Sequence, residues 1–417
     1  MASTSNCIWY ISKYVMPPGR GSVGGRGFLL MKELVCGGDK VVIITSDSNH
    51  LVRAPALNSP YMHESIDGVD LWWIRTLKYK TSKSIQRALS WLHFEWRLFR
   101  MPKEALPTPD VLVISSLSLL TILNGFLLRR RYRCRLIFEI RDIWPLTLIS
   151  EGDFKPYNPV VWFLSLVERW GYRHADLIVG TMPNLSEHVT NILGYRKPVA
   201  CIPMGFDGEI EDQMQPLPDD YVRSYIPRGK FIVSYVGSIG ISNALDPFFA
   251  CAAEFTNHPE IHFLVVGDGN LRAQYQEQYG HLQNISFGPE VSKDMVQSVL
   301  KNCDLLYFSG LTERWKFGQS LNKLIDYMLS GKPILASYSG FPSMINEAEC
   351  GYFITSGDVD ELKEKILDLA SMDRQDLVEM GLRGRRWILE NRNYRQLAQD
   401  YRALMFLPIE SVKASCL

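Results

Sequence analysis

The sequence lacks an excess of charge of either sign and any paired cysteine motif. Its 417 residues hold 45 Lys and Arg and 45 Asp and Glu, so the formal net charge at pH 7 is zero. The eight cysteines are scattered, and none forms the C-x-x-C pair that zinc and redox sites use. We therefore expect reduced cysteines, a cytosolic compartment and no bound metal.

Long apolar runs are also missing. The longest apolar stretch, residues 117–128, is interrupted and too short to span a bilayer. The N-terminus lacks the basic segment followed by an apolar segment that marks a signal peptide. We therefore expect neither a membrane-spanning helix nor a signal peptide, and the length suits two or three globular domains.

The neutral total conceals an uneven distribution of charge. Residues 1–210 hold 25 Lys and Arg against 18 Asp and Glu, whereas the remainder holds 20 against 27. Basic residues alternate with aromatics in residues 72–103, and a second basic cluster occupies residues 129–135. Both clusters suit an anionic membrane surface, although a packed helix with solvated basic residues is the alternative. No nucleic-acid-binding motif accompanies them, so we expect no nucleic-acid partner.

The first basic cluster also contains an amphipathic pattern. Four apolar residues recur near helical spacing: Ile85, Leu89, Leu92 and Trp96. This spacing predicts an amphipathic helix within residues 72–103.

The chain twice shows a strand, a glycine turn and a helix in succession. A predicted strand at residues 7–11 leads into a loop that contains Gly24 and Gly25, and a predicted strand at residues 231–236 leads into the turn Gly237-Ser238-Ile239-Gly240. Glycines in such turns let the backbone approach a phosphate closely. A flexible surface turn is the alternative for the first loop.

This order indicates an α/β protein with two Rossmann-like domains. We expect the boundaries to be 1–207 for the first domain, 208–229 for a polar linker, 230–390 for the second domain, and 391–417 for a crossover helix and tail.

Residues 313–337 combine a loop, a helix start, a helix stop and a strand. Ser320 is predicted to cap the helix, because its hydroxyl can accept from the free N–H groups of a first turn. Lys323 lies one turn into the helix, where it could reach an anion at the helix start. Asp326 lies three residues later, on the same face. The alternative is a helix with a solvated Lys–Asp pair.

Polar residues also follow a predicted strand at 136–140. Glu139, Arg141 and Asp142 lie at its end, where ligands bind in open α/β sheets. For Asp142 the alternative is a turn or helix-capping residue. The single D-x-D motif, Asp358-Val359-Asp360, opens a charged helix, so we expect it to cap that helix rather than to bind a metal.

Motifs along nearly the whole chain resemble glycosyltransferase family 4. The run S-L-N-K-L-I-D-Y-M-L-S-G-K-P at 320–333 is similar to its nucleotide-sugar segment, in the bacterial branch that contains the fucosamine, O-antigen and colanic-acid transferases. E-x-R-D-x-W-P at 139–145 is typical of the same branch, and I-P-M-G-F-D at 202–207 resembles a further family motif. Gly318 stands where the family has its first acid, and Met204 replaces the usual Asn.

The resemblance implies roles for residues at matching positions. Asp142, Lys323 and Asp326 would be the catalytic residues. The residues expected to bind substrate are Gly24, Gly25, His50, Glu139, Arg141, Gly237, Ser238, Gly240, Glu290, Val291, Ser320 and Asn322. Of these, Glu290 and Val291 would hold the nucleotide base, and the glycine turns would face the diphosphate. His50 is otherwise an ordinary loop histidine.

The resemblance also implies a fold and an activity. The fold would be GT-B, with two Rossmann-like domains facing across a cleft. The activity would be a retaining, metal-independent transfer of a hexosyl or N-acetylhexosaminyl group from a UDP-linked nucleotide diphosphosugar to a lipid-linked saccharide, in surface polysaccharide synthesis and without a cofactor. The enzyme would be cytoplasmic and peripheral on the inner face of the cell membrane. A sugar-nucleotide epimerase or a non-catalytic membrane-associated subunit is the alternative.

Overall fold

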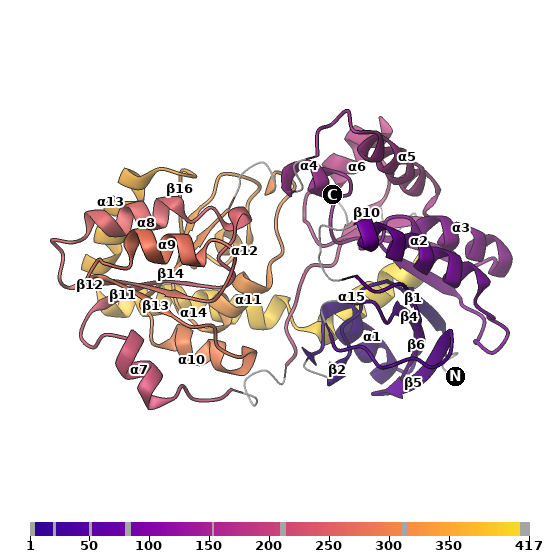
Figure 1. Cartoon of the computed structure of the whole chain (residues 1–417), viewed down its shortest axis with the longest axis horizontal. Helices are drawn as coiled ribbons and strands as arrows, with labels where there is room; N and C mark the ends of the chain where they lie inside the picture. Colours follow the sequence, from indigo (N-terminus) through magenta and orange to yellow (C-terminus); the bar gives the residue numbers. More distant parts are fainter. Residues whose placement is uncertain are drawn as a thin grey trace. The chain divides into compact units, whose positions relative to one another are not determined.

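The structure is a computed structural model that describes residues 5–19, 22–49, 52–79, 85–151, 154–208, 214–310 and 315–408. The chain forms two compact units (Figure 1). Unit 1 is Met1–Pro203 together with Tyr394–Leu417, and unit 2 is Met204–Asn393. Each unit is a sheet of mainly parallel strands that alternate along the chain with helices, as the sequence predicts.

Unit 1 is built on an eight-stranded sheet with the order β10-β9-β8-β7-β1-β4-β6-β5. All pairs are parallel except the pair of β5 with β6. Its central strands are continuous apolar runs because both faces of the sheet are covered. The strands are β1 (Cys7–Ile11), β4 (Lys40–Ser46), β5 (Tyr61–Ile66), β6 (Val69–Ile74), β7 (Val111–Ser115), β8 (Arg135–Ile140), β9 (Leu177–Gly180) and β10 (Val199–Cys201); a separate hairpin pairs β2 (Pro18–Gly19) with β3 (Ser22–Val23).

Helices cover both faces of this sheet. On one face α1 (Arg26–Cys36) and α15 (Tyr394–Phe406) share a core with β1 and β4. The other helices of unit 1 are α2 (Ile85–Arg100), α3 (Thr121–Tyr132), α4 (Leu146–Glu151), α5 (Pro159–His174) and α6 (Leu185–Leu193). Two glycines let α3 and α5 lie close to their neighbours: a Cβ at Gly125 would lie 2.6 Å from Ile114 Cγ1, and one at Gly171 would lie 2.9 Å from a ring carbon of Phe138.

Unit 2 is built on a six-stranded parallel sheet with the order β13-β12-β11-β14-β15-β16. The strands are β11 (Phe231–Val236), β12 (Ile261–Val266), β13 (Ile285–Gly288), β14 (Leu305–Ser309), β15 (Ile334–Ser337) and β16 (Gly351–Ile354). The helices are α7 (Asp219–Tyr225), α8 (Asp246–Glu254), α9 (Arg272–Tyr279), α10 (Val296–Lys301), α11 (Asn322–Leu329), α12 (Met344–Glu347), α13 (Val359–Ser371) and α14 (Arg374–Asn391), with 3-10 turns η1 (Ile241–Asn243) and η2 (Lys293–Met295). Helix α7 lies inside the predicted linker.

Two helices bear directly on the sequence predictions. The amphipathic helix predicted in residues 72–103 is α2. The D-x-D motif opens α13, where Asp358 Oδ1 accepts from the backbone N–H of Glu361 at 2.9 Å, so this aspartate is a helix cap as expected. No helix in the described ranges has both the length and the apolar character needed to cross a bilayer.

Candidate functional site

Two glycine turns meet at the carboxyl edge of the sheet in unit 2. The turn after β11 begins at Gly237, whose N–H donates to Val266 O at 2.9 Å, and Ile239 N donates to Asp268 O at 2.8 Å. The facing turn can approach this closely because it contains Gly267 and Gly269. A Cβ at Gly267 would lie 2.0 Å from Gly237 O, and a Cβ at Gly269 would lie 2.2 Å from Ile239 O. Both glycines also have positive φ, which L side chains rarely adopt.

Lys323 lies against the first of these turns. A Cβ at Gly237 would lie 2.6 Å from Lys323 Cε, so the glycine makes room for the lysine side chain. The ammonium group donates to Asn243 Oδ1 at 2.9 Å and to the Tyr235 hydroxyl, and it lies 4.1 Å from the centroid of the Tyr235 ring. Burial lowers the pKa of Lys323 to about 7. Its bonded oxygens within the described ranges are neutral, so a negative charge placed here would be favoured.

The start of α11 differs from the prediction. Ser320 does not cap the helix, because its hydroxyl accepts from the backbone N–H of Met204 at 2.6 Å. The residue before the helix is Leu321, and it has extended backbone and no side-chain cap. The first N–H groups of α11, beginning at the exposed Asn322, therefore lack the predicted serine partner, which is the state of a helix start that binds anions.

Asp326 and Lys323 bond different partners, although they lie three residues apart on α11. The carboxylate of Asp326 forms an ion pair with Lys293, and Gln297 Nε2 donates to the Asp326 carbonyl oxygen at 2.9 Å. Burial raises the pKa of Asp326, and the Lys293 ammonium opposes that rise. The predicted alternative, an ion pair between Lys323 and Asp326, is therefore not formed.

The ion pair brings Asp326 to the segment between β13 and α10. Glu290 and Val291 lie just before Lys293 in this segment, and Glu290 is exposed while Val291 packs against the core. Glu290 and Val291, which the resemblance assigns to the nucleotide base, thus lie close in the chain to the partner of Asp326. Ser238 is exposed on the turn after β11, and Gly240 O accepts from Asn243 N at 3.0 Å.

Gln319 is a polar residue that sequence reasoning missed. Its side chain is only 7% exposed, and neither atom of its amide has a hydrogen-bond partner in the described part of the chain. Buried amides are normally bonded, so this group is free to bond a ligand. The signal in the sequence was its place beside Gly318, where the family's first acid is missing.

In unit 1 the glycine pair forms the start of α1. Gly25 is the N-cap residue and has no side chain to cap the helix, and its N–H donates to Met16 O at 2.8 Å. Gly24 has φ +98° and donates to Ser22 Oγ at 3.0 Å. His50 lies outside the described residues.

Glu139 is part of a buried network. Arg26 Nη1 lies 2.7 Å from Glu139 Oε1, the Tyr10 hydroxyl donates to Oε2 at 2.8 Å, and both charged side chains are 0% exposed. Arg26 also donates to the carbonyl oxygens of Ile202 and Pro203. Burial alone would raise the pKa of Glu139, but the nearby arginines outweigh it and lower that pKa. A carboxylate enclosed in this way neutralises the buried Arg26 guanidinium and has no exposed surface to offer a substrate, contrary to the sequence expectation.

Arg141 and Asp142 follow β8 and are half-buried. Ser116 fixes their backbone, because its Oγ accepts from Arg141 N at 3.0 Å and donates to Asp142 O at 3.1 Å. The backbone of both residues is therefore fixed at the carboxyl edge of the sheet, and their role in a ligand site stays a prediction.

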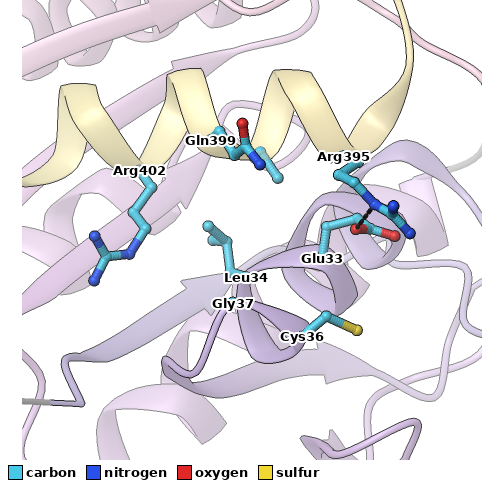
Figure 2. Close-up of a pocket in the computed structure, with 8 residues that line it drawn as sticks. Glu33, Leu34, Cys36, Gly37, Arg395, Gln399 and Arg402 are labelled. Carbon is cyan, nitrogen blue, oxygen red and sulfur yellow. Dashed lines mark ion pairs between the residues drawn. The ribbon is translucent and has the colours of Figure 1, made fainter. Parts of the chain in front are cut away.

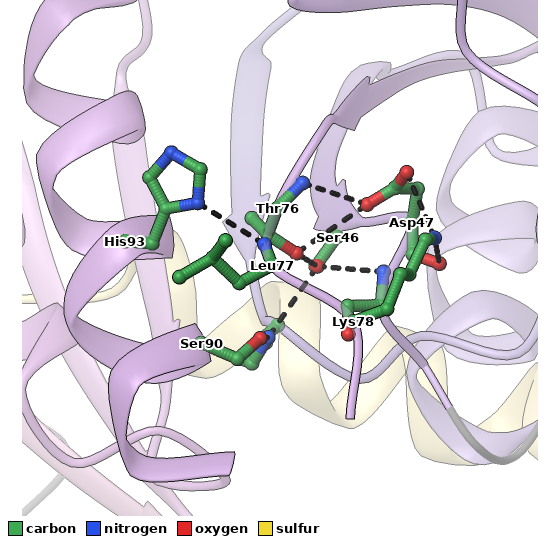
Figure 3. Close-up of polar contacts among 9 residues, drawn as sticks. Ser46, Asp47, Thr76, Leu77, Lys78, Ser90 and His93 are labelled. Carbon is green, nitrogen blue, oxygen red and sulfur yellow. Dashed lines mark hydrogen bonds and ion pairs between the residues drawn. The ribbon is translucent and has the colours of Figure 1, made fainter. Parts of the chain in front are cut away.

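A further polar cluster of unit 1, around Lys13 and Asp47, was not predicted from the sequence (Figure 3). Lys13, two residues past β1, is 0% exposed and donates to Ser90 Oγ at 2.9 Å and to Ser46 Oγ at 3.4 Å. Burial lowers the pKa of Lys13 to about 7, and the nearby Asp47 opposes this effect. The Asp47 carboxylate accepts from Thr76 N at 2.8 Å and lies 2.8 Å from Lys78 Nζ, as Figure 3 shows.

A cavity of about 300 Å³ lies between α1 and α15 (Figure 2). Arg395 pairs with Glu33 at 3.6 Å on its wall, and Arg402 is bonded to Asp39. Gly37 lines it just before β4 begins, so the cavity lies toward the amino ends of the strands and away from the edge that carries the residues above.

Among the described residues, no group of three or more His, Cys, Asp or Glu side chains is arranged to hold a metal ion.

Comparisons with known proteins agree with this architecture. Residues 29–205 match the family model described as glycosyl transferase 4-like domain, and residues 230–372 match the model described as glycosyl transferases group 1. No curated protein matches the sequence.

Solved structures resemble the chain over almost its whole length. Sucrose-phosphate synthase from Thermosynechococcus elongatus is 16% identical with a TM-score of 0.69, covering 96% of this chain and 99% of its own. A trehalose-6-phosphate protein from E. coli, bound with UDP-2-fluoro glucose, is 13% identical with a TM-score of 0.70 and the same two coverages. HepE from Anabaena, in complex with UDP-glucose, is 15% identical with a TM-score of 0.61, covering 98% and 99%.

Proposed function

We infer the function of the chain from its matches to the glycosyl transferase 4-like domain and to the glycosyl transferases group 1 domain, and from its GT-B fold. From this premise we propose that it transfers a hexosyl or N-acetylhexosaminyl group from a UDP-linked sugar to a lipid-linked saccharide, with retention of configuration. The observation that carries the proposal is Lys323, a half-buried cation with neutral partners beside a glycine turn. Structural neighbours that hold UDP or UDP-glucose support the choice of donor.

Lys323 is the proposed cation for the donor diphosphate. The turn Gly237-Ser238-Ile239-Gly240 supplies backbone close to the phosphates, and the uncapped start of α11 supplies N–H groups. Burial has lowered the pKa of Lys323 to about 7, and a bound diphosphate would favour the charged form of this lysine again. A charge-assisted hydrogen bond of this kind contributes about 1.5–3 kcal/mol.

The nucleoside side of the site is proposed to lie around Asp326, Glu290 and Val291. Asp326 is held by Lys293, which fixes the carboxylate before a ligand arrives. Gln319 is proposed to contact the transferred sugar, because its buried amide has unused donor and acceptor atoms in the described part of the chain. This contact would replace the one made by the acid that is absent at Gly318.

The reaction is proposed to be a front-face displacement. The bond between the sugar C1 and the diphosphate oxygen breaks while the acceptor oxygen bonds C1 on the same face, and the acceptor proton passes to the leaving phosphate. Lys323 stabilises the charge that develops on the leaving group, and the rest of the site acts mainly by positioning. Asp142 and Arg141 are the proposed contacts in unit 1, since they stand at the end of β8 on a fixed backbone.

The acceptor and the cellular setting follow from the basic first half of the chain. A lipid-linked saccharide lies at a membrane surface, and clustered arginines favour an anionic leaflet. We therefore propose a peripheral enzyme at the inner face of the cell membrane, acting in surface polysaccharide synthesis such as that of O-antigen.

A two-part assay tests the proposal. Nucleotide sugars are first screened for thermal stabilisation of the protein, because a ligand that binds only the folded state raises its melting temperature. The stabilising donor is then incubated with lipid-linked and with free saccharides. The proposal expects sugar transfer to the lipid-linked acceptor with retained anomeric configuration. Isomerised donor without an acceptor would indicate an epimerase, no turnover would indicate a non-catalytic subunit, and transfer only to free sugars would contradict the lipid acceptor.

A further inference from the structure

The apolar stripe of α2 faces away from the body of unit 1. Its members recur at alternating steps of four and three residues and are between 49% and 81% exposed: Ile85, Leu89, Leu92, Trp96 and Phe99. The side of the helix that packs inward instead carries Ser90, Phe94 and Leu98. An amphipathic helix normally buries its apolar stripe, so the orientation of α2 leaves this stripe without cover in the described structure.

Neighbouring helices extend the exposed apolar surface. Helix α3 adds Leu123 and Leu127 beside α2, and α5 with the segment before it adds Tyr157, Val160, Trp162, Phe163 and Leu166. Helices α2, α3 and α5 are drawn in neighbouring positions in Figure 1, and α3 contacts both of the others. We call these exposed side chains the three-helix face. Single exposed apolar residues are ordinary, but a set of this size on adjoining helices marks an interaction surface.

The charges on the same three helices are sorted by sign. The two acidic residues of α2, α3 and α5 are Glu95 and Glu168, and both are turned inward. Glu95 accepts from Thr121 Oγ1 at 2.6 Å, and Glu168 Oε1 lies 2.7 Å from His188 Nε2. The exposed charged residues of the three helices are all basic: Arg100, Arg130, Arg131, Arg169 and Arg173.

Three arginines of α2 and α3 lie over aromatic rings, of which Trp96 is exposed and Phe126 is half-buried. Arg97 and Arg100 lie 5.5 and 5.9 Å from the ring centroid of Trp96, and Arg130 lies 5.3 Å from that of Phe126. Tryptophan and tyrosine rings beside arginines are the side chains that occupy the boundary between lipid headgroups and acyl chains.

We infer that the three-helix face docks on an anionic lipid bilayer, with its apolar and aromatic side chains inserted at the headgroup boundary and its arginines among the phosphates. The inference deepens the proposed function, on which its biological sense rests, but docking needs no substrate. A second copy of this chain is a poorer occupant, because two faces that expose only basic charge would repel each other. Insertion adds an apolar component to the electrostatic attraction, so salt should weaken binding without abolishing it.

Vesicle flotation of the full chain tests this inference. We expect binding to vesicles of phosphatidylcholine mixed with phosphatidylglycerol, and much weaker binding to phosphatidylcholine alone. Leu92→Glu and Trp96→Glu place an acid on the face and remove apolar contact, and each should lower the partition coefficient by about tenfold or more. Leu389→Glu is the matched control, since Leu389 is 39% exposed on α14 in unit 2, and it should bind as the wild type does.

The outcomes separate the inference from the proposed function. If all three variants bound the anionic vesicles as tightly as the wild type, or if the wild type bound neither vesicle type, the docking face would be overturned. A wild-type dimer in light scattering that Leu92→Glu dissociates would assign the face to a second copy instead. Vesicle binding without sugar transfer to lipid would leave the docking face standing and refute the acceptor, whereas transfer without vesicle binding would do the reverse.

Discussion

Each unit holds a lysine near the carboxyl edge of its sheet, and burial lowers the pKa of each to about 7. Lys13 is enclosed completely, donates to two serine hydroxyls and has Asp47 and Glu95 nearby. Lys323 is only half-buried, donates to Tyr235 and Asn243, and lies against Gly237 at the start of a turn. A low pKa is therefore no evidence of a ligand site by itself. The difference is access, because only Lys323 borders a turn and a helix start that could receive an anion.

The largest expected effect concerns the buried charges of unit 1. Glu139→Gln breaks the pair with Arg26 and should lower the free energy of unfolding by about 3–5 kcal/mol, because the guanidinium stays buried without its counter-charge. Chemical denaturation followed by circular dichroism measures this change. Unchanged stability together with weaker acceptor binding would show that Glu139 contacts substrate, as the sequence predicted. The contrast between enclosed charges in unit 1 and an accessible charge in unit 2 would then no longer hold.

A pair of glycine substitutions separates the effect of backbone strain from the effect of displacing Lys323. Gly237→Ala places a methyl group 2.6 Å from Lys323 Cε, at φ +153°, and should weaken donor binding as well as cost about 1–3 kcal/mol of stability. Gly194→Ala is the control, because Gly194 has φ +79° with nothing within 4 Å of the added Cβ. Calorimetric titration with UDP should show weaker binding for the first variant only. Equal affinities for both variants would mean that Lys323 does not act at this turn.

The two lowered pKa values also predict a pH dependence. In the folded protein each lysine loses its proton near pH 7, whereas the unfolded chain keeps it up to about pH 10.5. The unfolded state therefore binds more protons in this window, so the free energy of unfolding should rise with pH. Lys13→Met should reduce this slope without changing nucleotide binding. Donor affinity should fall as pH rises above about 7, since the diphosphate favours charged Lys323; an affinity that rises instead would contradict that role.

The smallest expected effect is that of chelation. Sugar transfer should survive EDTA, because the proposed site stabilises the leaving diphosphate with Lys323 and backbone N–H groups. The assay follows product formation before and after dialysis against EDTA. Activity that disappears and returns with a single divalent ion would show that a metal, and not the lysine, carries the charge stabilisation.

Local patterns in the sequence predicted much of the fold. Glycine turns after apolar runs predicted both sheets, because parallel strands buried on two faces are continuously apolar and their turns need glycine. The amphipathic pattern predicted α2 but not its orientation. Which side of α2 packs inward depends on contacts with α3 and on the buried Phe94 and Leu98, and spacing alone does not encode these.

The candidate site was harder to predict because its key bonds join distant residues. Ser320 fits the pattern of an N-cap, yet its hydroxyl is bonded to Met204, 116 residues earlier in the chain. Asp326 is bonded to Lys293 rather than oriented by its helix neighbour Lys323. Glu139 fits a strand-end ligand residue, but its partner Arg26 lies 113 residues away. Motifs indicated candidate segments, whereas the bonding of each side chain depended on tertiary contacts.

The central claim is that Lys323 binds the donor diphosphate while Lys13 is structural. Isothermal titration of UDP and of uridine into the wild type, Lys323→Met and Lys13→Met tests it most directly. Loss of a charge-assisted bond of about 1.5–3 kcal/mol should weaken UDP binding to Lys323→Met by roughly tenfold or more. Uridine should bind all three proteins alike, and Lys13→Met should bind UDP as the wild type does. UDP affinity that Lys323→Met leaves unchanged, or that falls equally for uridine, would contradict the claim.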